Sequence, residues 1–190
     1  MCSTKQNEFM QEAIQLSIEN VKSGKGGPFG AVIVKDGKII AHGANSVTST
    51  NDPTAHAEVV AIRNACKALG TFQLDGCEIY TSCEPCPMCL GAIYWAWPDR
   101  MYFANTKKNA ADINFDDQFI YEELELPYQS RKLETVQMMN EEALEAFKLW
   151  SESIGKIEYW FFKIPMIQFI LNNQLIKTNK PASTTLLDFV

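Results

Sequence analysis

The chain has 190 residues, of which 46% are hydrophobic and 21% are charged. This length and composition are ordinary for a globular protein with one main domain and a sizeable core. The net charge is −6 and the isoelectric point is near 5.0. A partner held mainly through phosphates requires clustered Lys and Arg, so we expect no nucleic-acid partner.

The first predicted elements are a helix and a hairpin. Apolar residues at helical spacing predict a helix over 6–22, which the GKGGP loop ends. Residues 29–43 (FGAVIVKDGKIIAHG) indicate two strands joined at Asp36-Gly37, a strong signal for a short turn. A polar loop follows. Thr54 is then expected to cap a helix that begins at Ala55 and ends at Gly70.

Strands and helices continue to alternate after this helix. CEIYTS predicts a strand, PMCLGAIYWAW a helix entered through Pro87, and RMYFA another strand. Weaker signals indicate helices near 106–111 and 116–124, a strand near 132–138, and a helix over 141–155. The order predicts an α/β fold, a three-layer α/β/α sandwich with a mixed five-stranded sheet. The first two strands would pair antiparallel and the later ones parallel.

The C-terminal segment differs from the rest of the chain. We expect one domain over residues 1–159 and a tail of uncertain role over 160–190. The tail begins with WFFKIPMIQFILNN, which is apolar but short and is interrupted by Lys163 and Pro165. Such a segment is unlike a membrane span, so no membrane partner is expected. A packing appendage and a non-native fusion segment are the favoured alternatives, and a membrane-surface anchor is a third with few basic residues to support it.

Cysteine usage predicts a reducing compartment. There are six cysteines, and Cys83, Cys86 and Cys89 fall within seven residues of one another. Residues 1–20 are polar and amphipathic and show no secretory signal. This pattern is typical of thiols that serve a metal rather than disulfides. We therefore expect a cytoplasmic location.

Two short motifs supply candidate metal ligands and an acid. Zinc prefers imidazole and thiolate ligands, and a catalytic zinc keeps a fourth position open for water. Cys86 and Cys89 are three residues apart at a helix start, so their thiols share one face and the helix dipole favours thiolates. His56 also opens a helix. We predict one Zn²⁺ per chain, held by His56, Cys86 and Cys89, with Glu58 as the catalytic proton carrier.

Other cysteines and histidines offer alternatives. Cys83 could complete a closed structural zinc site, although a buried thiol is common at a strand end. Cys66 and Cys77 fit the core, and His42 lies late in the second strand, where a site role is not expected. A zinc domain without catalytic activity would have no use for the unligated carboxylate of Glu58.

The order H-x-E followed by P-C-x-x-C is the signature of zinc deaminases. The sequence resembles the cytidine-deaminase superfamily and, within it, the bacterial guanine deaminases. The similar segments are GGPFGAVIVKDGKII, NDPTAHAEV, TSCEPCPMCLGAIYWA and FDDQFIY, and the resemblance extends from about residue 7 to Tyr159. It implies hydrolytic deamination of guanine to xanthine and ammonia, with Glu58 moving the protons.

The resemblance also implies a set of substrate contacts. Asn45 would hydrogen-bond the purine, Phe29 and Trp95 would wall the base pocket, Asp117 would face the amino group, and Tyr159 would close the pocket. In related sequences the chain ends near Tyr159, whereas here 31 more residues follow. The family further implies a homodimer, in which C-terminal segments could be exchanged between subunits.

Each contact has an alternative. Asn45 could be a turn residue, Phe29 and Trp95 could belong to the core, and Asp116 could face the pocket in place of Asp117. The alternative functions are a tRNA adenosine deaminase and a cytosine or guanosine deaminase. The first normally has a basic C-terminal helix, whereas NEEALEAFKLWSES is acidic here.

Overall fold

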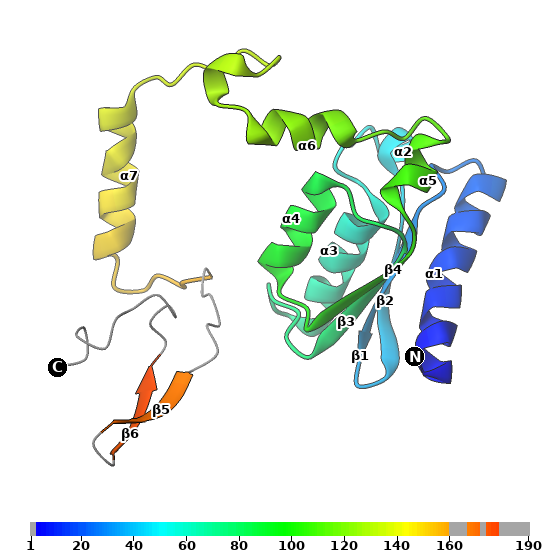
Figure 1. Cartoon of the computed structure of the whole chain (residues 1–190), viewed down its shortest axis with the longest axis horizontal. Helices are drawn as coiled ribbons and strands as arrows, with labels where there is room; N and C mark the ends of the chain where they lie inside the picture. Colours follow the sequence, from blue (N-terminus) through cyan, green and yellow to red (C-terminus); the bar gives the residue numbers. More distant parts are fainter. Residues whose placement is uncertain (1–2, 160–166, 172–173, 179–190) are drawn as a thin grey trace. The chain divides into compact units, whose positions relative to one another are not determined.

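The computed structural model describes residues 3–159, 167–171 and 174–178 (Figure 1). The chain forms two compact units, residues 1–138 and 139–190. The strands of the first unit are β1 (Gly30–Lys35), β2 (Lys38–Ala44), β3 (Cys77–Cys83) and β4 (Arg100–Asn105). Its helices are α1 (Thr4–Lys22), α2 (Val47–Thr50), α3 (Ala57–Leu69), α4 (Pro87–Ala96), α5 (Lys107–Ala111), α6 (Gln118–Glu125) and the short 3-10 helix η1 (Tyr128–Ser130).

The first unit is built on a mixed four-stranded sheet in the order β2-β1-β3-β4. β1 is antiparallel to both of its neighbours, and β3 and β4 are parallel. The predicted hairpin is confirmed: Asp36 and Gly37 have φ of 49° and 68°, as a two-residue turn between twisted strands requires. The α/β class and the mixed sheet are therefore as predicted.

The predicted fifth strand is wrong. Residues 132–138 form bends and extended chain without a ladder partner. Leu133 and Val136 are 77% and 69% exposed. Residues three apart point to opposite faces of a strand, so these two cannot form one apolar face for a sheet to bury. The sheet of the first unit consequently ends at β4.

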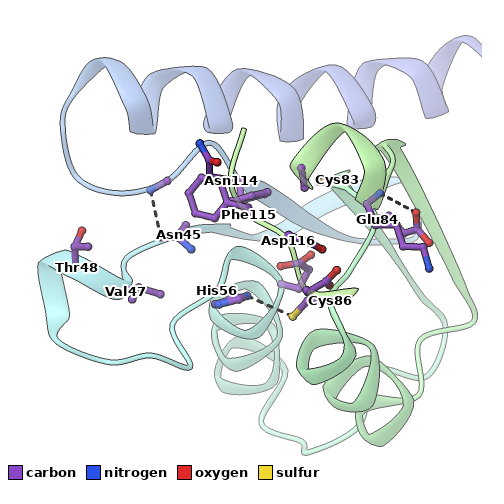
Figure 2. A pocket seen from close by; sticks show the side chains of 16 residues that line it. Asn45, Val47, Thr48, His56, Cys83, Glu84, Cys86, Asn114, Phe115 and Asp116 are labelled. Carbon is purple, nitrogen blue, oxygen red and sulfur yellow. Dashed lines mark hydrogen bonds between the residues drawn. The ribbon is translucent and has the colours of Figure 1, made fainter. Parts of the chain in front are cut away.

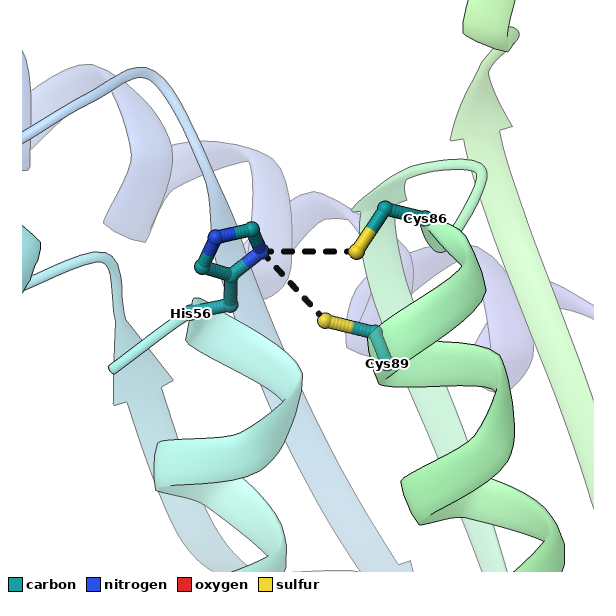
Figure 3. A group of neighbouring side chains, drawn as sticks. All are labelled: His56, Cys86 and Cys89. Carbon is teal, nitrogen blue, oxygen red and sulfur yellow. Dashed lines mark hydrogen bonds between the residues drawn. The ribbon is translucent and has the colours of Figure 1, made fainter. Parts of the chain in front are cut away.

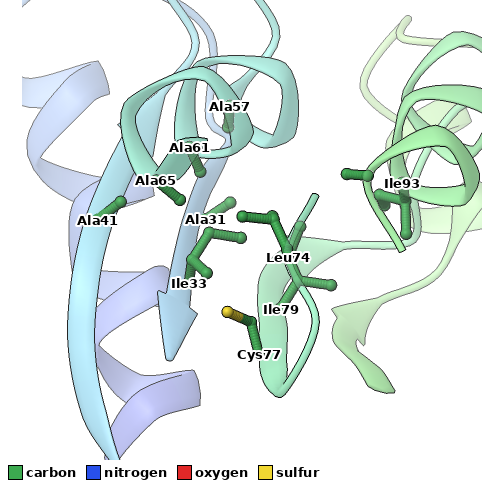
Figure 4. Close-up of a cluster of buried hydrophobic side chains, with 11 residues drawn as sticks. Ala31, Ile33, Ala41, Ala57, Ala61, Ala65, Leu74, Cys77, Ile79 and Ile93 are labelled. Atoms are coloured by element: carbon green, nitrogen blue, oxygen red, sulfur yellow. The ribbon is translucent and has the colours of Figure 1, made fainter. Parts of the chain in front are cut away.

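Helices cover both faces of the sheet (Figure 1). Val32 and Val34 of β1 pack with Phe9 and Ala13 of α1 on one face. The alternate residues of β1 turn to the other face, under α3 and α4, where Figure 4 shows the larger cluster. That cluster comprises Ala31, Ile33, Ala41, Ala57, Ala61, Ala65, Leu74, Cys77, Ile79, Ile93 and Ala96. This three-layer packing holds the first turns of α3 and α4 at one edge of the sheet.

Gly43 of β2 lies directly against the first turns of α3. A Cβ at this position would lie 2.1 Å from the Ala57 carbonyl oxygen and 2.4 Å from the Ala61 backbone nitrogen. We expect Gly43→Ala to lower the free energy of unfolding by roughly 3 kcal/mol, because the added methyl group forces α3 away from the sheet. Denaturant unfolding measures this. Gly91→Ala is the control: nothing lies within 4 Å of a Cβ there, so a gain of about 0.5–1 kcal/mol is expected in the helix. Equal losses in both variants would contradict the prediction.

The second unit contains α7 (Asn140–Glu152) and an antiparallel pair, β5 (Ile167–Leu171) and β6 (Gln174–Thr178). α7 corresponds to the helix predicted over 141–155, and the sequence patterns did not predict β5 and β6. The rest of the expected tail, residues 160–166, 172–173 and 179–190, lies outside the described residues. Among the residues described, no helix is long and apolar enough to cross a membrane.

Candidate active site

Two helix starts place the candidate metal ligands. α3 begins at Ala57 with His56 at its N-cap, two residues later than predicted. Thr54 is therefore not the N-cap, and its hydroxyl donates to Asp52 Oδ1 at 2.6 Å. The His56 side chain makes no capping hydrogen bond with its own helix. Cys86 is the N-cap of α4, which is entered through Pro87.

The three predicted ligands lie together. Figure 3 shows the His56 ring facing both sulfurs, with Nδ1 at 3.6 Å from Cys86 Sγ and 3.5 Å from Cys89 Sγ. One ligand atom from each residue lies within 4.8 Å of the others. One imidazole and two thiols in this arrangement fit the donor set of a catalytic zinc with an open position.

The electrostatics of this site favour a bound cation. A hydrogen bond from Cys89 and another from His56 lower the pKa of the Cys86 thiol to about 4. The hydrogen bond with Cys86 raises the pKa of His56. The hydrogen bond with Cys86, followed by burial, raises the pKa of the Cys89 thiol. A thiolate is the form of cysteine that binds a metal, so Cys86 is the ligand that already favours this form.

Glu58 is buried beside these ligands on the first turn of α3. It is 5% exposed, and this burial raises the pKa of its carboxyl group. The Thr81 hydroxyl on β3 donates to Glu58 Oε1 at 3.1 Å. A carboxylate held in a dry environment accepts a proton more readily than one in water. Glu58 therefore accepts a proton more readily than an exposed glutamate would, as a proton carrier requires.

A cavity of about 410 Å³ adjoins the ligands (Figure 2). Its lining includes the predicted residues His56, Glu58, Cys86, Asn45, Phe29 and Asp117. The volume is in the range of small-molecule sites. Trp95 does not line this cavity; it lies on α4 and is 50% exposed. Tyr159 belongs to the second unit, and its approach to the pocket stays a prediction.

Asn45 joins β2 to the cavity. It is 7% exposed, and its Oδ1 accepts a hydrogen bond from the backbone N–H of Gly27 at 3.3 Å (Figure 2). The amide nitrogen adds two N–H donors that Asn45 can offer to a ligand.

Phe115 lines the cavity and was missed by the sequence reasoning. Its ring meets that of Phe29 edge-on, with centroids 5.0 Å apart and planes at 88°. Asn114 before it has φ of 69°, a conformation that Asn tolerates better than most residues. The position of Phe115 next to the acidic pair in FDDQF is the only signal that could have indicated it. The other unpredicted lining residues are Gly27, Val47, Thr48, Glu84, Lys107, Ala110 and Asn114.

Both acidic residues of FDDQF line the cavity, but in different ways. Asp116 Oδ1 accepts a hydrogen bond from the backbone N–H of Gln118 at 2.9 Å. Asp117 is the more buried of the two, and desolvation, followed by the charge of Cys86, raises the pKa of its carboxyl group. The environment of Asp117 is thus coupled to the candidate metal site.

The alternative ligands are not members of this cluster, although Cys83 lines the same cavity. Cys83 is 4% exposed, and its Sγ contacts the Thr106 carbonyl oxygen at 3.6 Å. His42 lies 3.4 Å from Glu12 on an exposed surface. In the part of the chain that the structure describes, the only cluster able to hold a metal is that of His56, Cys86 and Cys89.

Residues 3–105 match the cytidine and deoxycytidylate deaminase zinc-binding region. This match spans more than half of the chain and includes both ligand motifs. The chain belongs to this deaminase family. The candidate ligand cluster described above lies within the matched zinc-binding region.

Individual deaminases resemble the chain to different extents. The guanine deaminase of Bacillus subtilis is 56% identical over 151 residues, which cover 80% of this chain and 97% of that protein. An X-ray structure of guanine deaminase from B. subtilis superposes with a TM-score of 0.80, covering 81% of this chain and 98% of that one. A tRNA-specific adenosine deaminase from Aquifex aeolicus is 47% identical, but over only 43% of this chain and 54% of its own length.

Proposed function

We propose that this chain is a zinc-dependent hydrolase that deaminates guanine to xanthine and ammonia. The observation that carries the proposal is the buried Glu58 beside the ligand cluster at the edge of a base-sized cavity. The nearly full-length similarity to a guanine deaminase favours guanine over other bases. The similarity to tRNA deaminases is limited to part of the chain.

His56, Cys86 and Cys89 would hold the zinc. The metal, when bound, polarises and acidifies a water molecule. In the overall hydrolysis the C2–N bond of guanine breaks, a C2–O bond forms, and the amino group leaves as ammonia. Glu58 takes up a proton at a carboxylate oxygen, delivers it to a ring nitrogen, and later carries a proton to the departing amino group. The hydroxyl of Thr81 orients that carboxylate.

The cavity residues would orient the base. The amide nitrogen of Asn45 donates to an acceptor on the purine. The ring of Phe29, which Phe115 contacts edge-on, packs against an apolar face of the purine. Asp117 accepts from the amino group that is to leave. Trp95 and Tyr159 are implied by the family resemblance alone.

Asp117 and Asp116 provide a matched test of this assignment. We expect Asp117→Asn to lower kcat/KM for guanine by about 100-fold, since a positioned carboxylate typically contributes that much. Asp116→Asn should cost less than about 10-fold, because Asn retains an oxygen to accept the N–H of Gln118. Steady-state kinetics with guanine measure both. If Asp116→Asn lost more kcat/KM than Asp117→Asn, Asp116 would be the residue that faces the amino group.

The proposal extends to the oligomeric state, the cellular location and the domain bounds of the chain. A homodimer, with or without exchange of C-terminal segments, and a cytoplasmic location are both in keeping with it. The five cysteines in the described part of the chain are free thiols, which suits a reducing compartment. The deaminase domain would comprise residues 1–159, with 160–190 as an appended tail.

Ammonia release with guanine, guanosine, cytosine, adenine and a tRNA as substrates tests the function. Xanthine formed from guanine alone is the expected result. Turnover of only tRNA or cytosine would contradict the proposal. A truncation after Tyr159 that retains full activity would assign residues 160–190 to an appendage.

A further inference from the structure

The buried face of α1 carries polar side chains near its C-terminal end. Ser17 and Asn20 are 8% and 6% exposed, whereas Ile18 and Val21 are 41% and 53% exposed. Burying an amide while apolar neighbours remain at the surface is unfavourable unless the amide is hydrogen-bonded. The contacts of Asn20 must therefore offset this cost.

Asn20 joins two loops that line the cavity. Its Nδ2 donates hydrogen bonds of 2.8 Å to the carbonyl oxygens of Gly27 and Asn45. An amide group has two N–H donors, so both are engaged. The N–H of Gly27 donates to Oδ1 of Asn45 at 3.3 Å, and the N–H of Asn45 donates to the Phe29 carbonyl oxygen at 3.1 Å. Asn45 is thus held through both its backbone and its side chain.

Close backbone packing fixes the spacing between α1 and these loops. A Cβ on Gly26 would lie 2.0 Å from the Asn45 carbonyl oxygen, and a Cβ on Gly30 would lie 2.4 Å from the Ala13 carbonyl oxygen on α1. No side chain fits at either position without moving the backbone. The amide of Asn20 consequently meets its two acceptors in one arrangement.

We propose that Asn20 is the positioning residue for Asn45 and determines affinity for the base without touching it. The inference rests on the proposed contact between Asn45 and guanine. Without Asn20, the Gly27 loop and the Asn45 carbonyl lose their common anchor, and the Asn45 amide samples other rotamers. His56 and Cys86 belong to α3 and α4, so the metal centre is unaffected.

The test replaces Asn20 with Leu, whose side chain has the same branched shape and number of heavy atoms but no donor. KM for guanine should rise by about 10-fold, the effect of two lost hydrogen bonds, while kcat stays within about 3-fold. Zinc content should not change. Asn20→Ser, whose smaller side chain adds no bulk and whose hydroxyl can serve at most one carbonyl, should also raise KM. Ser17→Ala is the matched control, because Ser17 lies on the same buried face and bonds only to the Ile14 carbonyl of its own helix.

Two further measurements separate positioning from general stability. Adding Asn20→Leu to Asn45→Ala should raise KM little further, because the side chain to be positioned is already absent. Amide hydrogen exchange at Gly27 and Asn45 should be faster in Asn20→Leu and unchanged in Ser17→Ala. An unchanged KM in Asn20→Leu, or a fall in kcat together with zinc loss, would overturn the inference. If the unaltered protein does not deaminate guanine, the proposed function fails, and the exchange rates alone then decide whether Asn20 anchors Asn45.

Discussion

Glu58→Gln is expected to lower kcat for guanine by about 1,000-fold or more while the protein keeps about one zinc per chain. The amide has the shape of the carboxylate and can still accept the hydrogen bond from Thr81, but it cannot take up a proton. Ligation and proton transfer belong to different residues, so the two properties should separate. Metal analysis by atomic emission and steady-state kinetics on one preparation provide the measurement.

Glu12→Gln serves as the control for this substitution, because it removes a surface carboxylate outside the cavity. Its activity should match that of the unaltered chain. If Glu58→Gln lost its zinc, Glu58 would be a ligand, and the division between metal binding and proton transfer would be wrong.

Cys89→Ser is expected to lose most of the zinc and to lower the activity by about 1,000-fold or more. Cys89 is fully buried and its Sγ lies 3.5 Å from His56 Nδ1. A serine hydroxyl at neutral pH is a much weaker zinc ligand than a thiolate, and its oxygen would lie at a different distance. Zinc content after dialysis and activity with guanine measure the effect.

Cys83→Ala is the informative comparison for the metal centre. Cys83 lies three residues before Cys86, and it would be a ligand only in a closed structural site. Its zinc content should remain about one per chain. Loss of zinc from Cys83→Ala would make the site a four-ligand structural one and would remove the open position on which the proposed hydrolysis depends.

Features that depend on a few neighbouring residues were predictable from the sequence. The turn at Asp36-Gly37 follows from backbone conformation alone, and the start of α4 follows from Pro87. The start of α3 was predicted two residues too early. The residues carrying the chemistry are of this kind, since each ligand lies at the start of an element. The fold brings these residues together, and none of them needs an unusual local conformation.

Features that depend on distant partners were not predictable. Apolar spacing places Ile18 and Val21 on the favoured face of the first helix, yet the structure buries Ser17 and Asn20 there. The amide of Asn20 donates hydrogen bonds to carbonyl groups 7 and 25 residues away. Such contacts cannot be predicted from the spacing of apolar residues. The strand predicted over residues 132–138 was wrong because a segment with a β-rich pattern forms a strand only when a neighbouring strand pairs with it.

The N-cap of α3 has a consequence for engineering. Ser, Thr, Asp or Asn at this position typically contributes about 1 kcal/mol by capping the first turn, and His56 makes no such bond. Stabilisation by optimising helix caps would therefore select this position for replacement and would remove a proposed zinc ligand. Conversely, a metal that binds only the folded chain stabilises it, and this stabilisation grows with the logarithm of the free metal concentration once that concentration exceeds the dissociation constant. The thermal midpoint of this protein should therefore report zinc supply, so the active site is also the place where the fold responds to metal availability.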